Sequence, residues 1–226
     1  MERNKYRIIQ TDVAKEMNHG ICVSNLAYRI AKRMELPEDM CYDLAVAGLL
    51  HDIGKLELTK YVHSVQKEEN TLHVEEMRYV RTHAALGYVI LNSQGYSREI
   101  AEWVLYHHEN YDGSGYPANK AGEEIPLGAR ILRVCDVFSA LTSDRSYRRA
   151  FDLETAVKLM IAEVKNFDMK IFLTFLEVVH EEDIPEMISQ QGYTVKELAY
   201  ALGDMLLCSE DMGVQQETTE KREEQQ

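Results

Sequence analysis

Apolar residues recur at intervals of three and four along most of this chain, which is the spacing that places them on one face of an α-helix. We find no stretch in which apolar and polar residues alternate as they do in an amphipathic strand. One helix is predicted from about residue 19 to the residue before Pro37, whose ring disfavours continuation. A second opens at 37–39 and leads its apolar face into His51 and Asp52. The pattern therefore predicts an all-α fold.

Six further helices and two loops are predicted in the rest of the chain. After a polar loop at 59–71, the spacing predicts helices over 75–92, from the capping residue Ser97 to His107 and His108, over 127–141, and at 152–164, 169–180 and 195–207. Residues 110–126 contain three glycines and two prolines, so we expect an ordered loop there.

We expect a single catalytic domain with short additions at both ends. Residues 1–18 form a lead-in segment, 19–180 the domain, and 181–208 a helical extension packed on it. Residues 209–226 are acidic and contain few apolar side chains, so a disordered tail is predicted there.

Composition narrows the class of protein. The 226 residues are 45% hydrophobic and 28% charged, which suits a globule with a sizeable core. The net charge of −13 disfavours binding to DNA, RNA or an anionic membrane. No apolar run approaches the roughly 20 residues that cross a bilayer, and the first residues do not resemble a secretion signal. We therefore expect a cytoplasmic protein.

Several histidines and two aspartates lie where the apolar faces of the predicted helices end. A core pays a desolvation cost for each unpaired titratable group, whereas a metal cation offsets that cost. Imidazole nitrogens and carboxylate oxygens suit iron, manganese or zinc, and a carboxylate can bridge two ions. We thus infer a dinuclear metal site, and interpret His63, His73 and His180 as structural. The side chains concerned are His19, His51, Asp52, His83, His107, His108 and Asp136.

A series of motifs identifies a known family. In order, the chain contains HDIGK at 51–55, HHE at 107–109, DGSGYP at 112–117, ARIL at 129–132 with Asp136, and DRSYR at 144–148. This succession resembles the signatures of HD-GYP phosphodiesterases. The resemblance extends from about residue 19 to 175 and implies an HD-domain helical bundle with an HD-GYP loop, beyond which additional C-terminal helices follow. It also implies metal-dependent hydrolysis of cyclic di-GMP, a bacterial second messenger, to pGpG and/or GMP.

The resemblance assigns the metal ligands position by position. Four residues match the ligands of the HD core, namely His19, His51, Asp52 and Asp136, and three complete a second metal, namely His83, His107 and His108. Asp52 is the expected bridge. Some members bind a third metal through a glutamate at the position of Lys15, and Glu16 is displaced from it by about 100° around a helix. We therefore expect two divalent ions, iron or manganese.

Two such ions would activate a water molecule and stabilise an in-line displacement at phosphorus. Asp52 and Lys55 are the predicted catalytic residues, because Lys55 is placed to reach a phosphate oxygen. The predicted substrate-binding residues are Lys55, Tyr116, Arg145 and Arg148. Arg130 is equally explained by an internal salt bridge. The two ions and these cations would attract an anion despite the net charge, because distant surface acids are screened beyond about 8 Å.

Several alternatives stay open. The substrate is cyclic di-GMP or another cyclic dinucleotide such as cyclic GMP-AMP, and a non-catalytic nucleotide sensor or interaction module is the third reading. Tyr116 and Pro117 form a rim that a diguanylate cyclase or another regulatory protein would recognise. A homodimer formed through the apolar helix after Met169 competes with burial of Phe172 and Phe175 in the domain's own core.

Overall fold

The computed structural model describes residues 13–56, 81–144 and 148–189. Every regular element in these ranges is helical, which confirms the all-α prediction. The α-helices are α1 (Val13–Arg33), α2 (Glu38–Leu50), α5 (His83–Ser93), α6 (Arg98–Tyr106), α7 (Leu127–Thr142), α8 (Leu153–Ala162), α9 (Met169–Val178) and α10 (Ile184–Ser189). Two short 3₁₀ turns, Gly122–Glu124 and Val164–Asn166, complete the list.

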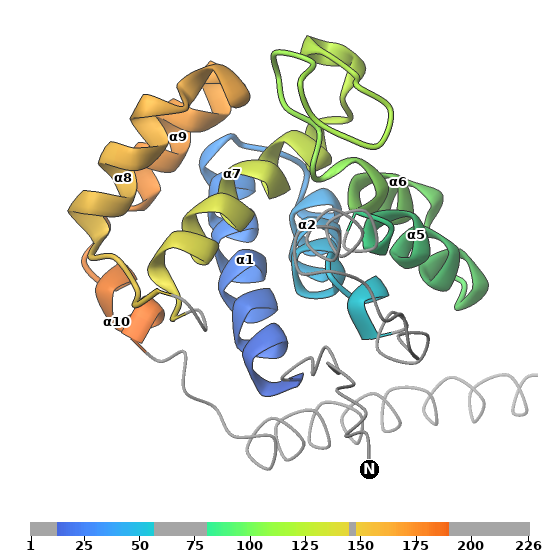
Figure 1. Cartoon of the computed structure of the whole chain (residues 1–226), viewed down its shortest axis with the longest axis horizontal. Helices are drawn as coiled ribbons and strands as arrows, with labels where there is room; N and C mark the ends of the chain where they lie inside the picture. Colours follow the sequence, from blue (N-terminus) through green and yellow to red (C-terminus); the bar gives the residue numbers. More distant parts are fainter. Residues whose placement is uncertain (1–12, 57–80, 145–147, 190–226) are drawn as a thin grey trace, which may run out of the picture. The chain divides into compact units, whose positions relative to one another are not determined.

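Helix α1 is the element around which the others are arranged. It packs against α2, α7 and α9, while α6 packs against α2, α5 and α7 (Figure 1). Its apolar face is completely buried at Val23, Leu26 and Ile30. The helix begins at Val13 rather than near residue 19, so it continues without a break across the predicted end of the lead-in segment. The domain boundaries stay predictions, and the predicted helix at 195–207 and the predicted tail at 209–226 lie outside the described residues.

The helix starts follow the capping signals in the sequence. Ser97 Oγ accepts a hydrogen bond from the backbone N–H of Ile100 at 3.2 Å, as predicted for the start of α6. Asp152 and Asp168 accept in the same way from the first turns of α8 and α9. Each cap satisfies an N–H that has no partner within its own helix.

The predicted helix over 75–92 differs from the observed one. Residues 57–80 lie outside the described ranges, and Arg81 and Thr82 form a turn before α5 begins at His83. Thr82 has φ −79° and ψ −14°, close to helical values. A turn with such a backbone preserves the three-to-four spacing of apolar residues, so the pattern did not distinguish it from a helix.

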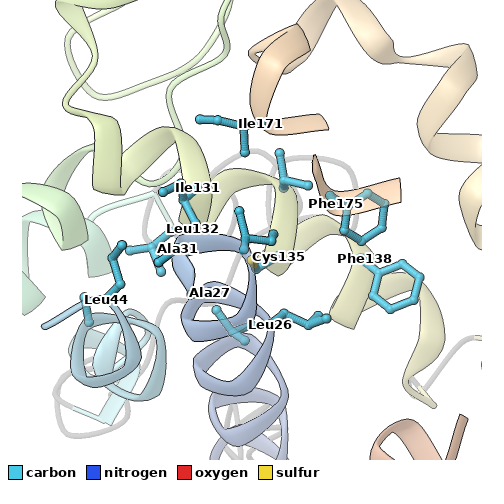
Figure 2. Close-up of a cluster of buried hydrophobic side chains, with 14 of the residues drawn as sticks. Leu26, Ala27, Ala31, Leu44, Ile131, Leu132, Cys135, Phe138, Ile171 and Phe175 are labelled. Atoms are coloured by element: carbon cyan, nitrogen blue, oxygen red, sulfur yellow. The ribbon is translucent and has the colours of Figure 1, made fainter. Parts of the chain in front are cut away.

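The core joins α1, α2, α7 and α9. Figure 2 shows Leu26, Ala27 and Ala31 of α1 facing side chains of α7 and α9, among them Phe138 and Phe175. The rings of Phe138 and Phe175 meet edge to face with centroids 5.1 Å apart. Phe172 and Phe175 are buried, which favours the domain's own core as their environment. The homodimer stays a prediction. None of the described helices combines the length and apolar content that crossing a bilayer requires.

Candidate metal centre

The predicted ligands come together from five helices. His19 lies on α1, Asp136 lies on α7, and the others lie at helix ends: His51 and Asp52 just after α2, His83 at the start of α5, and His107 and His108 just after α6. Six of the seven are less than 10% exposed, and His108 keeps 17% of its side chain accessible. Residues separated by up to 117 positions in the chain thus form one buried polar cluster.

The first half of the cluster contains two histidines and two aspartates. His19 Nε2 lies 3.1 Å from Asp136 Oδ1 and 3.8 Å from Asp52 Oδ2. His51 Nε2 lies 3.2 Å from Asp52 Oδ2 and 3.7 Å from Asp136 Oδ1. Each of the two nitrogens thus lies within 3.8 Å of both carboxylates, and His19, His51 and Asp52 form a group able to hold an ion, to which Asp136 does not belong.

The second half contains three histidines and the other oxygen of Asp52. His83 Nε2 lies 3.2 Å from Asp52 Oδ1, 3.4 Å from His107 Nε2 and 3.1 Å from His108 Nε2. Asp52 belongs to both groups of residues able to hold an ion. Oδ2 thus faces one half of the cluster and Oδ1 the other, and the bridging role of Asp52 stays a prediction.

The hydrogen bonds at the outer edge of the cluster favour cation binding. His51 Nδ1 donates to the carbonyl of Gly48 at 2.8 Å, and His107 Nδ1 donates to that of Val104 at 2.6 Å. In the neutral ring the second nitrogen then carries a lone pair that points into the cluster. His51 Nε2 is buried and has no hydrogen-bond partner among the described residues. Two nitrogens that bind one ion tetrahedrally at 2.0–2.1 Å lie about 3.4 Å apart. His83 Nε2 and His107 Nε2 are separated by that distance, 3.4 Å.

The protonation states of the cluster largely match those of a metal site. Burial alone would raise the pKa of Asp52 and Asp136, but neighbouring histidines hold both well below their usual range. Burial and adjacent imidazoles lower the pKa of His107, and burial lowers that of His108 to about 3. His51 differs, because Asp52 and Asp136 outweigh its burial and raise its pKa to about 10. A metal ion must displace that proton.

Lys55 lies beside the bridging carboxylate. Its Nζ donates to Asp52 Oδ2 at 2.5 Å and to Glu16 Oε2 at 3.1 Å. Burial lowers the pKa of Lys55, but the nearby Asp52 and Glu16 carboxylates raise it by more than burial lowers it. The net shift of the pKa is upward, so the ammonium stays charged. Glu16, the residue displaced from the third-metal position, therefore has Lys55 as its partner. It belongs to neither ligand group found among the described residues.

The glycine-rich loop folds back onto the two adjacent histidines. The Tyr116 ring stacks on the His108 ring with centroids 4.7 Å apart, and Tyr116 N donates to the His108 carbonyl at 3.2 Å. A Cβ on Gly115 would lie 2.2 Å from the backbone nitrogen of Asn110. Only glycine permits this close approach, so Gly115 allows Tyr116 to cover His108.

Two supporting residues were missed by the sequence analysis. Glu109 is 1% exposed, and its Oε1 accepts from the backbone of Ala118 at 2.6 Å, which closes the loop. Ser139 Oγ lies 2.8 Å from His19 Nδ1. Ser139 follows Asp136 by three positions, so helical spacing places both on one face of α7 and could have revealed it. Glu109 is the last residue of the HHE motif at 107–109, but the motif did not indicate its role in closing the loop.

Of the two predicted substrate-binding arginines, Arg148 has its guanidinium bonded at the end of α7. Arg148 donates to the carbonyls of Ala140 and Leu141 at 2.8 and 3.0 Å, and lies over the Phe151 ring. Its guanidinium thus caps the end of α7. Arg130 pairs with Asp168 at 2.6 Å, the internal salt bridge that the sequence left open. Arg145 lies outside the described residues.

The remaining histidines were predicted to be structural. His180 is exposed, and its Nδ1 donates to the carbonyl of Leu176 at 2.6 Å, within its own chain segment and in neither ligand group. His63 and His73 lie outside the described residues.

Two curated proteins are similar in sequence to this chain over most of its length. Over 162 residues the chain is 35% identical to the cyclic di-GMP phosphodiesterase PA4108 of Pseudomonas aeruginosa. This match includes 71% of the present chain and 38% of that protein. Over 156 residues it is 33% identical to the 3′3′-cGAMP-specific phosphodiesterase 1 of Vibrio cholerae, with 68% and 36% covered. The chain thus spans less than two-fifths of these relatives.

Solved structures share the fold. The cyclic GMP-AMP phosphodiesterase V-cGAP3 of V. cholerae superposes with a TM-score of 0.58 at 21% identity, covering 82% of this chain and 50% of that one. The HDG"Y"P protein Bd1817 of Bdellovibrio bacteriovorus gives 0.60 at 17%, with 76% and 55% covered. The family model described as HD domain matches residues 3–171. Because that match covers most of the sequence, this chain belongs to the HD domain family.

Proposed function

We propose that this chain is the catalytic domain of a metal-dependent phosphodiesterase that hydrolyses cyclic di-GMP to pGpG and/or GMP. The observation that carries the proposal is the position of Asp52, whose two oxygens face separate groups of imidazoles while Lys55 contacts one of them. The names of the curated relatives that act on cyclic dinucleotides support the substrate class.

The donor set fits two divalent ions. His19, His51 and Asp136 would hold one with Asp52 Oδ2, and His83, His107 and His108 would hold the other with Asp52 Oδ1. Bound at these positions, the ions would supply Lewis acidity and a water of lowered pKa. Nitrogen and oxygen ligands suit iron or manganese, which remain our choice.

The protein's own groups would position and neutralise the phosphate. Lys55 is charged and retains a partial exposure of 24%, so its ammonium can donate to a non-bridging phosphate oxygen as negative charge grows. Glu16 holds the Lys55 side chain from the other side. Asp52 would contribute one carboxylate oxygen to each half of the site.

Residues outside the cluster would contribute to substrate and partner binding. The partly exposed Tyr116 ring, stacked on His108, can contact a nucleotide at the entrance, and Tyr116 with Pro117 can contact a diguanylate cyclase or another regulatory protein. Arg145 stays a predicted phosphate or base ligand. Arg148 would have to release the carbonyls at the end of α7 to take that role.

A second candidate substrate is another cyclic dinucleotide. Relatives named 3′3′-cGAMP-specific phosphodiesterases match this chain at 31 to 35% identity, about as well as those named for cyclic di-GMP. Identity of this order does not separate guanine–guanine from guanine–adenine substrates. A non-catalytic sensor is disfavoured, because no ligand position in the cluster is degenerate.

The test is turnover by protein loaded anaerobically with iron(II) or manganese(II), with metal content measured in the same sample. We expect cyclic di-GMP to be linearised to pGpG, with or without further hydrolysis to GMP. Asp52→Asn should abolish turnover, whereas Asp39→Asn, an exposed position on α2, should behave as wild type. Intact cyclic di-GMP with two ions bound per chain would overturn the proposal. Preferential cleavage of cyclic GMP-AMP would favour the second candidate.

A further inference from the structure

Two arginines without an assigned role contact the glycine-rich loop that carries Tyr116. The Arg81 guanidinium lies over that ring, with Cζ 5.1 Å from its centroid. The same ring stacks on His108, one of the candidate ligands, at 4.7 Å. Arg81 is therefore one aromatic ring away from the metal cluster, and its side chain is exposed to solvent.

Arg133 reaches the same region from α7. It precedes Asp136 by three positions, so the two side chains share a face of the helix. Its Nε donates to Asn110 Oδ1 at 3.0 Å, which ties it to the glycine-rich loop. Arg81 over the Tyr116 ring and Arg133 at Asn110 therefore approach the same loop from two different elements.

The guanidinium donors of these two arginines are less committed than those of Arg29, Arg130 and Arg148. Arg29, Arg130 and Arg148 each direct terminal nitrogens to carboxylates or carbonyls. Among the described residues, no carboxylate pairs with Arg81, and only the Nε of Arg133 has a hydrogen-bond partner. A guanidinium over an aromatic ring keeps its N–H groups available for a phosphate.

We propose that Arg81 and Arg133 form a second anion subsite, which binds the phosphate of the substrate that is not being hydrolysed. The inference rests on the proposed function, because a cyclic dinucleotide carries two phosphodiesters and only one can occupy the metal pair. Lys55, tied to Asp52 and Glu16, serves the phosphate at the metals. The subsite makes Arg81 and Arg133 determinants of affinity for dinucleotides over substrates with a single phosphodiester.

The experiment compares two substrates and several variants of the manganese-loaded chain. Cyclic di-GMP carries two phosphodiesters, and bis(4-nitrophenyl) phosphate carries one. We expect Arg81→Ala and Arg133→Ala each to raise the KM for cyclic di-GMP about tenfold, as loss of a charged hydrogen bond implies. Turnover of bis(4-nitrophenyl) phosphate and the metal content should change less than twofold. Arg81→Lys and Arg133→Lys should recover part of the affinity, and Arg98→Ala on α6 is the control.

Equilibrium binding separates the failure of this inference from that of the proposed function. If cyclic di-GMP binds without being cleaved, and the two variants weaken its binding about tenfold, the subsite stands and the hydrolase proposal falls. If cleavage is observed and the variants match wild type, the subsite is overturned alone. Equal losses with both substrates would make the arginines structural supports of Tyr116 and also overturn it. Absence of both binding and cleavage overturns the two proposals together.

Discussion

Two clusters of charged side chains in this protein have opposite character. At the end of α1, Arg29 and Arg33 both pair with Glu181, at nitrogen–oxygen distances of 2.8 and 2.6 Å. Arg29 also pairs with Asp183 and Arg33 with Glu177, and all of these side chains are partly exposed. Each arginine there has a carboxylate partner. At the metal centre, imidazoles and the Asp52 and Asp136 carboxylates are buried together, and Lys55 is the ammonium that contacts Asp52. Matched, exposed pairs contribute little to stability, whereas a buried cluster of titratable side chains is typical of a functional site.

The largest effect should come from removing one ligand of the second half. His83→Ala removes the nitrogen that lies within 3.4 Å of three other ligand atoms. We expect the bound metal to fall from two ions to one per chain and turnover to fall by about three orders of magnitude, since a metal contributes several kcal/mol to transition-state stabilisation. His180→Ala is the matched control, because that exposed histidine contacts only a helix carbonyl. Retention of both ions would contradict the assignment.

Metal affinity should also depend on pH. With its pKa raised to about 10, His51 carries a proton in the apoprotein throughout the neutral range, and metal binding must release it. The apparent affinity for manganese should therefore rise by at least about tenfold per pH unit between pH 6 and 8. Calorimetry in buffers of different ionisation enthalpy measures the protons released. Affinity that is independent of pH would show that His51 is already neutral.

Backbone packing around the centre is tested at Gly54. A Cβ there would lie 2.0 Å from the carbonyl oxygen of His83, so Gly54→Ala must push α5 away from the end of α2. We expect a loss of about 1–3 kcal/mol in the free energy of unfolding, with weaker binding of the second ion. Urea denaturation and metal titration check both parts. An unchanged second site would mean that α5 adjusts without moving His83.

A smaller effect is expected at Glu109. Glu109→Ala removes the acceptor of the Ala118 N–H and should loosen the loop that carries Tyr116, at a cost of about 1 kcal/mol. Hydrogen exchange at Ala118 should accelerate, and Glu109→Gln should restore protection because its amide oxygen still accepts. Glu123→Ala, an exposed position in the same loop, is the control. Unchanged exchange in Glu109→Ala would contradict the role.

The smallest effect should come from the charge cluster at the end of α1. Arg29→Ala removes pairs to Glu181 and Asp183 from a side chain that is 31% exposed. We expect a loss of less than about 1 kcal/mol in stability, smaller still at high salt, with metal content and turnover unchanged. Thermal unfolding at two salt concentrations measures it. A change in metal content would remove the distinction between the two clusters.

Much of this architecture could be predicted because its signals are local. Ser97 caps α6 as its hydroxyl required, and the apolar spacing correctly located α2, α7 and α9. The turn at Arg81 and Thr82 escaped prediction because its backbone is nearly helical. The start of α1 was placed too late, although Val13, Ala14 and Met17 already follow helical spacing.

The sequence by itself determined the choice of candidate ligands and the helix ends at which we expected them, because motif order and helical periodicity are properties of neighbouring residues. Only the tertiary structure decided which oxygen of Asp52 faces which histidines and that Arg148 caps α7. It also decided that Arg81 lies over Tyr116 and that Arg133 bonds to Asn110 in the same loop. These relations join residues from different helices. They depend on how closely the helices approach, which is set by contacts such as Gly54 against His83 rather than by spacing along the chain.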